Sequence, residues 1–373
     1  MRMAIDCRYV RERPSGIGTY VQALASLVPP RATDTEFQLW RHRRAPARLS
    51  RAPNVIELRV SPEPNTLRTI LYARAYAPLE HLDLFHGPHN LLPIGLTCPT
   101  VVTVHDTLWL EAPHLVDRRW RRLLKQLFMP RAMAFAIGRA TRILTPSTAT
   151  ADAVGSIAPS SRPRLRVVPH GVDAAFTPAT DSEAARAEAS ALIGSDETYL
   201  LVIGQNAPRK GHDVALRAFA QAAPAGVSLV FVQRQHGPAG LERLARELDV
   251  SSRVRWLPAM PQEQVAVLLR SSLALLQPSE HEGFGLPVLE AMACGCPVIA
   301  SGIPALAEVL GGAGMLVPPS DVRALAAAIR SLAGEPSKRV DMRLLGLERA
   351  RQFTWERCAA ETLAVYREAA EGR

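Results

Sequence analysis

Short apolar runs alternate with segments of helical periodicity along the whole chain. Thirteen runs have the length and continuous apolar character of buried strands, at residues 3–7, 36–40, 54–58, 83–86, 100–105, 142–145, 165–168, 199–203, 228–232, 254–257, 273–277, 297–300 and 315–317. Strands that alternate with helices predict parallel sheets covered by helices on both faces. Because thirteen strands exceed the roughly ten of an ordinary open sheet, we expect two doubly wound α/β domains.

The boundary between the two domains is expected after Pro169, where glycine, proline and a polar stretch interrupt the pattern. We therefore place a first domain at residues 1–172 and a second at residues 173–353. A last helix, at residues 354–373, follows the second domain, and Thr354 can cap it. Its apolar residues recur at helical spacing, so this helix must pack against one of the domains.

The positive charge is concentrated in the first half of the chain. The net charge is +9, but residues 1–170 carry +12 and the remainder −3. This asymmetry predicts an anionic partner for the first half: nucleic acid, anionic lipid or an acidic substrate. A basic helix at 117–131 fits either an anionic membrane surface or an ordinary place on the sheet. Its basic residues include Arg118, Arg119, Arg121, Arg122 and Lys125. No nucleic-acid-binding motif accompanies the charge, so we expect no nucleic-acid partner.

Other sequence features narrow the class of protein. No apolar run reaches the roughly 18 residues that span a bilayer, and the N-terminus has no apolar core of a secretory signal. The five cysteines are scattered without zinc-binding spacing, at Cys7, Cys98, Cys294, Cys296 and Cys358. We therefore expect a cytoplasmic protein without a metal site, peripheral at the inner face of the cytoplasmic membrane if the basic half binds lipid.

The most specific segment is residues 278–301, which has the pattern of a strand, a glycine-rich loop and a helix. Gly283 and Gly285 leave backbone amides uncovered where the helix begins, which predicts an anion site. Glu282 precedes the helix, and Glu290 lies within it among apolar neighbours. A carboxylate in that setting needs hydrogen-bond donors, and sugar hydroxyls can supply them. Either glutamate alone could equally be an exposed acid at a helix start.

The segment resembles the donor-binding motif of the retaining family-four glycosyltransferases, in which seven residues separate two glutamates. Glu282 and Glu290 have this spacing, within Glu-Gly-Phe-Gly-Leu-Pro-Val-Leu-Glu-Ala-Met-Ala-Cys-Gly, and the resemblance extends over nearly the whole chain. It implies the glycosyltransferase B (GT-B) fold: two Rossmann-like domains that face each other across a cleft, with the last helix crossing back to the first domain. The first domain would bind the acceptor, and the second a nucleotide-sugar donor.

The resemblance also implies roles for individual residues. Glu290 would accept hydrogen bonds from the donor ribose, and Glu282 would contact hydroxyls of the transferred sugar. The backbone of the glycine-rich loop would lie near the sugar and the phosphates, at Gly283, Phe284, Gly285 and Leu286.

A second segment, residues 199–212, has a buried strand followed by Arg209 and Lys210 just before a helix. Two cations at a helix N-terminus repel the positive end of the helix dipole unless an anion joins them, and a diphosphate would do so. Lys210 is one of only three lysines, which favours a specific role over a solvated basic turn. Gln205 stands where many members of the family have an arginine, so we expect Lys210, and secondarily Arg209, to bind the diphosphate.

Gly16 and Gly18 form a third glycine-rich segment. A dinucleotide site would need a further glycine where Val21 stands, so the pattern does not favour NAD. The family resemblance implies that the two glycines form a loop over the donor phosphates and the acceptor. The alternative is an ordinary helix start capped by Ser15.

A fourth segment ends a buried strand with His105 and Asp106. The resemblance places a functional histidine here, near an outer hydroxyl of the sugar, and Asp106 would orient it or bind the acceptor. A lone histidine at such a position is otherwise a hydrogen-bonded core residue. Ser147 is expected to cap its helix, and residues 170–173 to form the crossover turn.

The sequence thus predicts a retaining glycosyltransferase, with Lys210, Glu282 and His105 as catalytic residues. Resemblance to bacterial mannosyltransferases implies transfer from GDP-mannose to a glycan or lipid-linked acceptor in surface polysaccharide assembly; UDP- and dTDP-sugars stay open as donors. No Asp-x-Asp motif stands where a cation could bridge the phosphates, so we expect no metal and no cofactor. The alternatives are a nucleotide-sugar epimerase and a catalytically silent scaffold.

Overall fold

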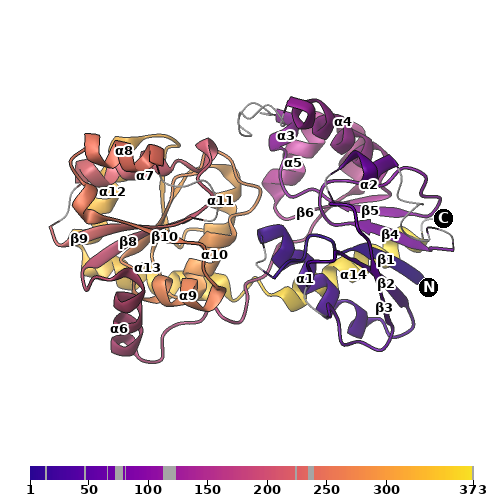
Figure 1. Cartoon of the computed structure of the whole chain (residues 1–373), viewed down its shortest axis with the longest axis horizontal. Helices are drawn as coiled ribbons and strands as arrows, with labels where there is room; N and C mark the ends of the chain where they lie inside the picture. The colour runs from indigo at the N-terminus through magenta and orange to yellow at the C-terminus, as the bar shows by residue number, and fades with distance from the viewer. Residues whose placement is uncertain are drawn as a thin grey trace. The chain divides into compact units, whose positions relative to one another are not determined.

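The computed structural model of the chain describes residues 1–12, 15–45, 48–64, 66–71, 79, 81–111, 123–222, 225–233 and 239–371. The chain forms two compact units (Figure 1). Unit 1 consists of Met1–Gly171 with Thr354–Arg373, and unit 2 is Val172–Phe353. Four arginines of the basic helix expected at 117–131, at positions 118, 119, 121 and 122, lie outside the described residues.

Unit 1 contains a seven-stranded parallel sheet in the order β3-β2-β1-β4-β5-β6-β7. Its strands are β1 (Arg2–Asp6), β2 (Glu36–Arg41), β3 (Val55–Arg59), β4 (Leu84–Gly87), β5 (Thr100–Thr103), β6 (Arg142–Thr145) and β7 (Leu165–Val167). The central strands β4 and β5 are buried along their whole length. Their continuous apolar runs are what a sheet covered on both faces requires.

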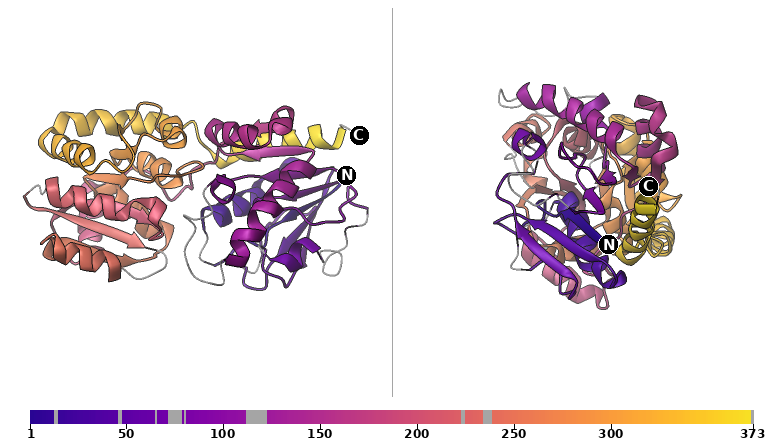
Figure 2. Two further views of the ribbon diagram at one scale, coloured as in Figure 1. Left: turned by 90° about the horizontal axis from the view of Figure 1, so that it is seen from above. Right: turned by 90° about the vertical axis from the view of Figure 1, so that its right-hand side faces the viewer.

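Helices cover both faces of this sheet: α1 (Gly16–Leu27), α2 (Leu67–Leu71), α3 (Leu108–Glu111), α4 (Leu123–Arg139), α5 (Thr148–Ile157) and α14 (Trp355–Glu371). The α14 helix, yellow in Figure 2, packs along α1 and against β4, β5 and β6. The hydroxyl of Tyr366 lies 2.5 Å from Nδ1 of His86 on β4. Gly171 permits the entry of α14, because a Cβ atom there would lie 2.1 Å from the backbone nitrogen of Trp355. The last helix is therefore an integral part of unit 1.

Unit 2 contains a six-stranded parallel sheet in the order β10-β9-β8-β11-β12-β13. The strands are β8 (Thr198–Gly204), β9 (Val227–Gln233), β10 (Val254–Pro258), β11 (Ala274–Gln277), β12 (Val298–Ser301) and β13 (Met315–Val317). The helices are α6 (Ser182–Ile193), α7 (His212–Ala222), α8 (Ala239–Glu247), α9 (Gln262–Ser271), α10 (Leu286–Ala293), α11 (Pro304–Leu310), α12 (Val322–Gly334) and α13 (Pro336–Ala350).

The core of unit 2 lies on both sides of its sheet. One apolar cluster joins the sheet to α7, α8 and α12, and the other joins it to α9, α10 and α11. Short 3-10 helices connect several elements of the two units, at Pro29–Arg31, Pro159–Arg164, Pro208–Lys210 and Ser251–Arg253. The two α/β domains with parallel sheets expected from the sequence are thus confirmed.

Each sheet has one point where the chain reverses its direction of winding. In unit 1 this point lies between β1 and β4, and in unit 2 between β8 and β11. Connections leave such a strand pair toward opposite sides, which opens a crevice at the carboxyl ends of the two strands. The loops after β1, β4, β8 and β11 are therefore where ligand-binding residues are expected.

The length and polarity of the helices also bear on the membrane. Among the described residues, no helix combines the length and apolar character that crossing a bilayer requires.

Candidate functional site

The reversal point of unit 2 brings Lys210 and Glu282 together. Lys210 ends the 3-10 turn Pro208–Lys210 that follows β8, and Glu282 lies in the loop after β11. The Lys210 Nζ atom donates to Oε1 of Glu282 at 2.5 Å, and the side chains are 14% and 10% exposed. Two residues that the sequence separates by 72 positions thus form one ion pair at the carboxyl edge of the sheet.

Glu282 is held by two further side chains. Its Oε1 atom also accepts hydrogen bonds from Nε2 of Gln277 and from Oγ of Ser279, each at 2.8 Å. Burial acts to raise the pKa of the Glu282 carboxyl, but Lys210, Arg209 and these hydrogen bonds outweigh it and lower the pKa below its ordinary value. The carboxylate is therefore fixed in place and ionised at neutral pH. Gln277 was missed in the sequence, although a polar residue ending a buried strand was a usable signal.

Glycines allow the two loops of this site to approach each other. Gly211 has φ +62°, and a Cβ atom there would lie 2.2 Å from the carbonyl oxygen of Pro278. Gly285 starts α10 with φ +106°, and a Cβ atom there would lie 2.5 Å from Leu306. Only glycine adopts such backbone geometry without strain. A side chain at position 211 would force the lysine and glutamate loops apart, and one at position 285 would meet the side chain of Leu306.

The start of α10 presents backbone rather than side chains. The first residues of the helix are Leu286 and Pro287, and no side chain of the described residues caps it. Phe284 is only 6% exposed and packs edge-on against Phe353 in the core of unit 2. The Gly283–Leu286 loop is therefore anchored by an apolar side chain while the positive end of α10 follows it, which is favourable for an anion.

Glu290 lies on α10 and is partly buried. Burial, and secondarily the nearby Asp173, raise the pKa of its carboxyl to about 7. Within the described part of the chain, this carboxyl accepts no hydrogen bond from another side chain. Its environment lacks the donors that a carboxylate needs, and the hydroxyls of a sugar could supply them. Asp173 was expected only to form the crossover turn, and its charge effect on Glu290 was not predicted.

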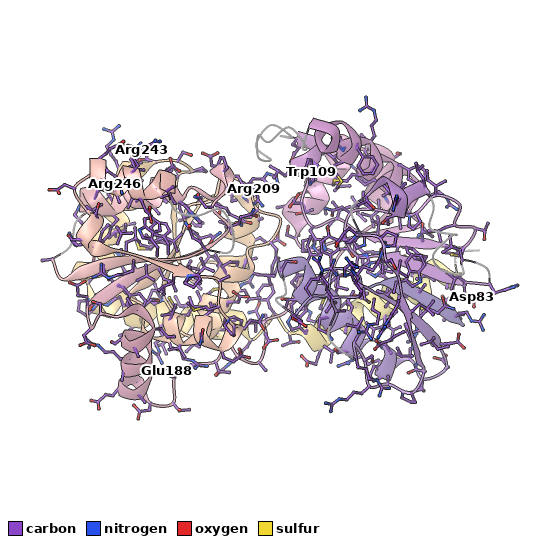
Figure 3. The ribbon with its side chains drawn as sticks, viewed as in Figure 1. Asp83, Trp109, Glu188, Arg209, Arg243 and Arg246 are labelled. Atoms are coloured by element: carbon purple, nitrogen blue, oxygen red, sulfur yellow. The ribbon has the colours of Figure 1, made fainter. Side chains whose placement is uncertain are left out.

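Arg209 precedes Lys210 in the turn Pro208–Lys210, and its place on unit 2 is labelled in Figure 3. Among the described residues, its guanidinium makes one long hydrogen bond, 3.4 Å from Nη1 to the carbonyl of His281. The carbonyl of Arg209 accepts from the amide of Glu280. Arg209 therefore ties its loop to the loop of Glu282 through backbone contacts and still has donors for a ligand.

His105 lies at the carboxyl end of β5 in unit 1, and both of its ring nitrogens have partners. Its Nε2 lies 2.8 Å from the carbonyl oxygen of Pro88, and its Nδ1 lies 3.3 Å from Nε2 of His170. Burial lowers the pKa of His105 to about 4, so the ring is neutral. These contacts are those of a hydrogen-bonded core histidine, the alternative that the sequence left open.

Asp106 and the two N-terminal glycines take local structural positions. Asp106 Oδ1 accepts from the amide of Leu108 and so stabilises the start of α3. The expected loop at Gly16 and Gly18 is wrong: both residues lie in the first turn of α1. The reason is Ser15, whose side chain caps the helix by accepting from the amide of Gly18.

Unit 1 also contains a charged cluster that the sequence analysis did not single out. Asp6 ends β1, Arg8 follows it, and His89 lies in the loop after β4. Arg8 Nη2 lies 2.6 Å from Asp6 Oδ2, and His89 Nε2 lies 2.9 Å from the same oxygen. Charged residues directly after the first strand were a usable signal, but their partner could be found only once the order of the strands was known.

The site in unit 2 has the properties of an anion- and hydroxyl-binding site. It joins a partly exposed ammonium, a fixed carboxylate, an uncapped helix start and a second carboxyl short of donors. In the described part of the chain, no group of three or more His, Cys, Asp or Glu side chains could hold a metal ion.

Comparisons with known proteins agree with this geometry. Residues 14–176 match the family described as Glycosyltransferase Family 4, and residues 184–346 match the one described as Glycosyl transferases group 1. The chain is 29% identical to the O-antigen chain mannosyltransferase B of Escherichia coli over 302 residues, 79% of this chain and 77% of that protein. It is 30% identical to the D-inositol 3-phosphate glycosyltransferase of Kribbella flavida over 325 residues, 82% and 75% of the two chains.

The fold is likewise shared with solved structures. The Alr3699/HepE protein of Anabaena, in complex with UDP-glucose, superposes with a TM-score of 0.71 at 17% identity, covering 97% of this chain and 99% of that one. At this identity the likeness shows the fold alone. It confirms the two parallel-sheet domains of the GT-B fold.

Proposed function

The chain belongs to the group 1 glycosyltransferases, and we propose that it transfers a mannosyl group from GDP-mannose to a hydroxyl of a glycan or lipid-linked acceptor. The Lys210–Glu282 pair at the reversal point of unit 2 carries this proposal. It supplies a cation for a diphosphate and a carboxylate for sugar hydroxyls at one place, beside the uncapped start of α10.

In this proposal the donor lies across the loops after β8 and β11. Lys210 contacts the diphosphate with the hydrogen atoms not given to Glu282, and Arg209 supports it from the same turn. Glu282 contacts the sugar, and Glu290 accepts from the ribose hydroxyls, which provide the donors that its surroundings lack. The backbone from Gly283 to Leu286 lies along the phosphates.

The chemical step follows from the same charges. The acceptor oxygen bonds to the anomeric carbon as the bond from that carbon to the diphosphate breaks, and the hydroxyl proton goes to the departing phosphate. Attack on the face that the diphosphate leaves retains the configuration. Negative charge grows on the leaving phosphate, so a preorganised cation such as Lys210 binds the transition state more tightly than the bound donor.

Similarity to the E. coli O-antigen chain mannosyltransferase B supports mannose and an acceptor in surface polysaccharide assembly. The relatives described as D-inositol 3-phosphate glycosyltransferases do not name mannose. The HepE structure holds UDP-glucose, so a UDP-linked donor is the rival hypothesis. The rival donors therefore differ in the base, which a binding measurement can identify.

A thermal-shift screen with GDP, UDP and dTDP tests the donor. We expect GDP to raise the melting temperature most, and mannosyl transfer from GDP-mannose to appear in a product analysis. Stabilisation by UDP alone would overturn the choice of donor. Conversion of the sugar without an acceptor would identify an epimerase, and binding without turnover a silent scaffold.

We also propose that transfer requires no metal ion, since the fixed charges of Lys210 and the α10 start take the part of a bridging cation. Activity after exhaustive treatment with EDTA should equal that of untreated enzyme. A loss that Mg²⁺ or Mn²⁺ restores would contradict this expectation.

The charge of the first half supports a peripheral membrane partner. Residues 1–170 carry a net +12, and we propose that they bind the anionic inner face of the cytoplasmic membrane. Binding to phosphatidylglycerol vesicles should fall as salt shortens the Debye length. Glutamine substitutions at the four positions 118, 119, 121 and 122 should reduce it further; binding that ignores both changes would contradict the proposal.

A further inference from the structure

Unit 1 has its own reversal point, and a charged cluster occupies it just as one does in unit 2. Asp6 ends β1, Arg8 follows it in the next loop, and the loop after β4 supplies His89. In unit 2 the loops after the corresponding strands supply Lys210 and Glu282. Because ligands of parallel α/β sheets bind at such points, the cluster in unit 1 stands where a ligand of this unit is expected.

The cluster is rigid and almost fully enclosed. Asp6 accepts from Nε of Arg8 at 2.7 Å and from Nη2 at 2.6 Å, and both side chains are 1% exposed. The remaining Nη1 group of Arg8 donates to the carbonyl of Pro62 and to Thr69 Oγ1. Arg8 therefore has its donors committed within unit 1, and its role is to hold Asp6.

Asp6 in turn fixes the proton on the ring of His89. Burial acts to raise the pKa of the Asp6 carboxyl, but Arg8 and His89 outweigh it and hold the pKa far below its ordinary range. An ionised carboxylate only accepts hydrogen bonds, so Nε2 of His89, 2.9 Å from Oδ2, carries a proton. A ring that carries only this one proton presents a lone pair at Nδ1.

This Nδ1 atom is buried and has no hydrogen-bond partner in the described part of the chain. His89 as a whole is 2% exposed. A buried polar atom without a partner raises the free energy of the protein, and a ligand that supplies a donor lowers it. His105, by comparison, has both ring nitrogens hydrogen-bonded within unit 1.

We propose that Nδ1 of His89 accepts a hydrogen bond from a hydroxyl of the sugar acceptor, which makes His89 an acceptor-binding residue positioned by Asp6 and Arg8. The ring of the partly exposed Tyr9 packs on that of His89, with 4.8 Å between the ring centroids. The inference rests on the proposed function, because it assumes that the chain transfers a sugar to a hydroxyl.

Two substitutions distinguish the roles of the two ring nitrogens of His89. His89→Gln keeps an amide near Nε2 that can donate to Asp6, but it removes the acceptor at Nδ1. His89→Asn places an amide oxygen near Nδ1 and loses the reach to Asp6. The pair is matched, since both variants replace the ring by a neutral carboxamide.

The experiment uses GDP-mannose as donor and octyl α-D-mannopyranoside as acceptor. We expect His89→Gln to raise the KM for the mannoside about 10-fold, the cost of one hydrogen bond, while the slow hydrolysis of GDP-mannose by water keeps its rate. His89→Asn should keep a KM within a few-fold of wild type but melt at a lower temperature. An unchanged KM in His89→Gln, or an equal loss of hydrolysis and transfer, would overturn the role of His89.

The wild-type enzyme provides the separate check on the proposed function. Wild type that neither hydrolyses GDP-mannose nor transfers from it to the mannoside would refute mannosyl transfer itself, and the inference with it. Wild type that transfers, with a His89→Gln variant of normal KM, would refute only the inference.

Discussion

The two units have the same arrangement of strands around their reversal points, yet they bury their ion pairs to different extents. The Arg8–Asp6 pair of unit 1 is 1% exposed on each side, whereas the Lys210–Glu282 pair of unit 2 is 14% and 10% exposed. Arg8 has each of its side-chain nitrogens hydrogen-bonded, but the Lys210 ammonium donates to Glu282 alone among the described residues. The comparison indicates different roles for the two ion pairs. The enclosed Arg8–Asp6 pair holds neighbouring side chains in place, whereas the partly exposed Lys210–Glu282 pair still has hydrogen-bond donors for a ligand.

The largest expected effect is the loss of Asp6, which would leave Arg8 buried without a counter-charge. Asp6→Ala should lower the free energy of unfolding by about 3–5 kcal/mol, measured by denaturant titration. Asp152→Ala, at an exposed position on α5, is the control and should change little. Glu282→Ala should destabilise less than Asp6→Ala because its pair is partly open; equal losses would remove the contrast between the units.

Loss of Lys210 tests the open pair through activity. Lys210→Ala should lower the maximal rate roughly 100- to 1000-fold at saturating donor, because the charge that it neutralises is largest in the transition state. Lys210→Arg should keep partial activity, since the planar guanidinium keeps the positive charge but has a different shape from the compact ammonium. Lys338, paired with Glu335 on α13, provides the matched control, and Lys338→Ala should be fully active. An active Lys210→Ala enzyme would place the diphosphate elsewhere.

The two glutamates of unit 2 should separate in a binding measurement. Glu290→Gln should weaken the binding of free GDP about 10-fold, because a neutral amide replaces the carboxylate that accepts from the ribose. Glu282→Gln should leave GDP binding nearly intact yet slow transfer, since free GDP has no sugar to contact. Isothermal titration of both variants checks this, and equal losses of affinity would contradict the assignment.

The smallest expected effect is a dependence of GDP binding on pH. Burial and Asp173 raise the pKa of Glu290 to about 7, so its carboxylate forms as the pH rises through neutrality. GDP affinity should therefore increase a few-fold between about pH 6 and 8. The affinity of the Glu290→Gln variant for GDP, measured over the same pH range, shows how much of the change comes from the titration of GDP itself. If the affinity of wild type depends on pH in the same way, the role of Glu290 is ruled out.

The same pKa has a consequence for stability. The raised pKa means that the folded state favours the neutral Glu290 carboxyl. The contribution of this group to folding stability is therefore fully present below the ordinary pKa of a glutamate and is lost as the pH rises through about 7. Without nucleotide, the melting temperature of wild type should therefore fall relative to that of the Glu290→Gln variant as the pH rises.

The sheets and the glutamate motif were predictable from the sequence because both depend on local patterns. Continuous apolar runs separated by helices determine a parallel α/β fold, and the spacing of Glu282 and Glu290 follows from one loop and one helix. The ion pair between Lys210 and Glu282 was not predicted, since it joins two loops through the adjacency of β8 and β11.

The cluster of unit 1 was missed for the same reason. Asp6 and His89 are 83 positions apart, and only the pairing of β1 with β4 brings their loops together. His170 lies at the crossover between the units, as expected, but its contact with His105 was not predicted. Gly16 and Gly18 were misplaced because a glycine-rich pattern suggests a loop, whereas the cap by Ser15 starts a helix.

The place of α14 in unit 1 affects how the chain can fold as it is made. Unit 1 is discontinuous: residues 1–171 need residues 354–373, and Tyr366 meets His86 across 280 positions. A ribosome working from the N-terminus completes every residue of unit 2 before it makes α14. Since domains generally fold as units during synthesis, unit 2 can fold on the nascent chain before α14 is made. The surface of β4 and β5 that α14 covers stays uncovered until translation ends.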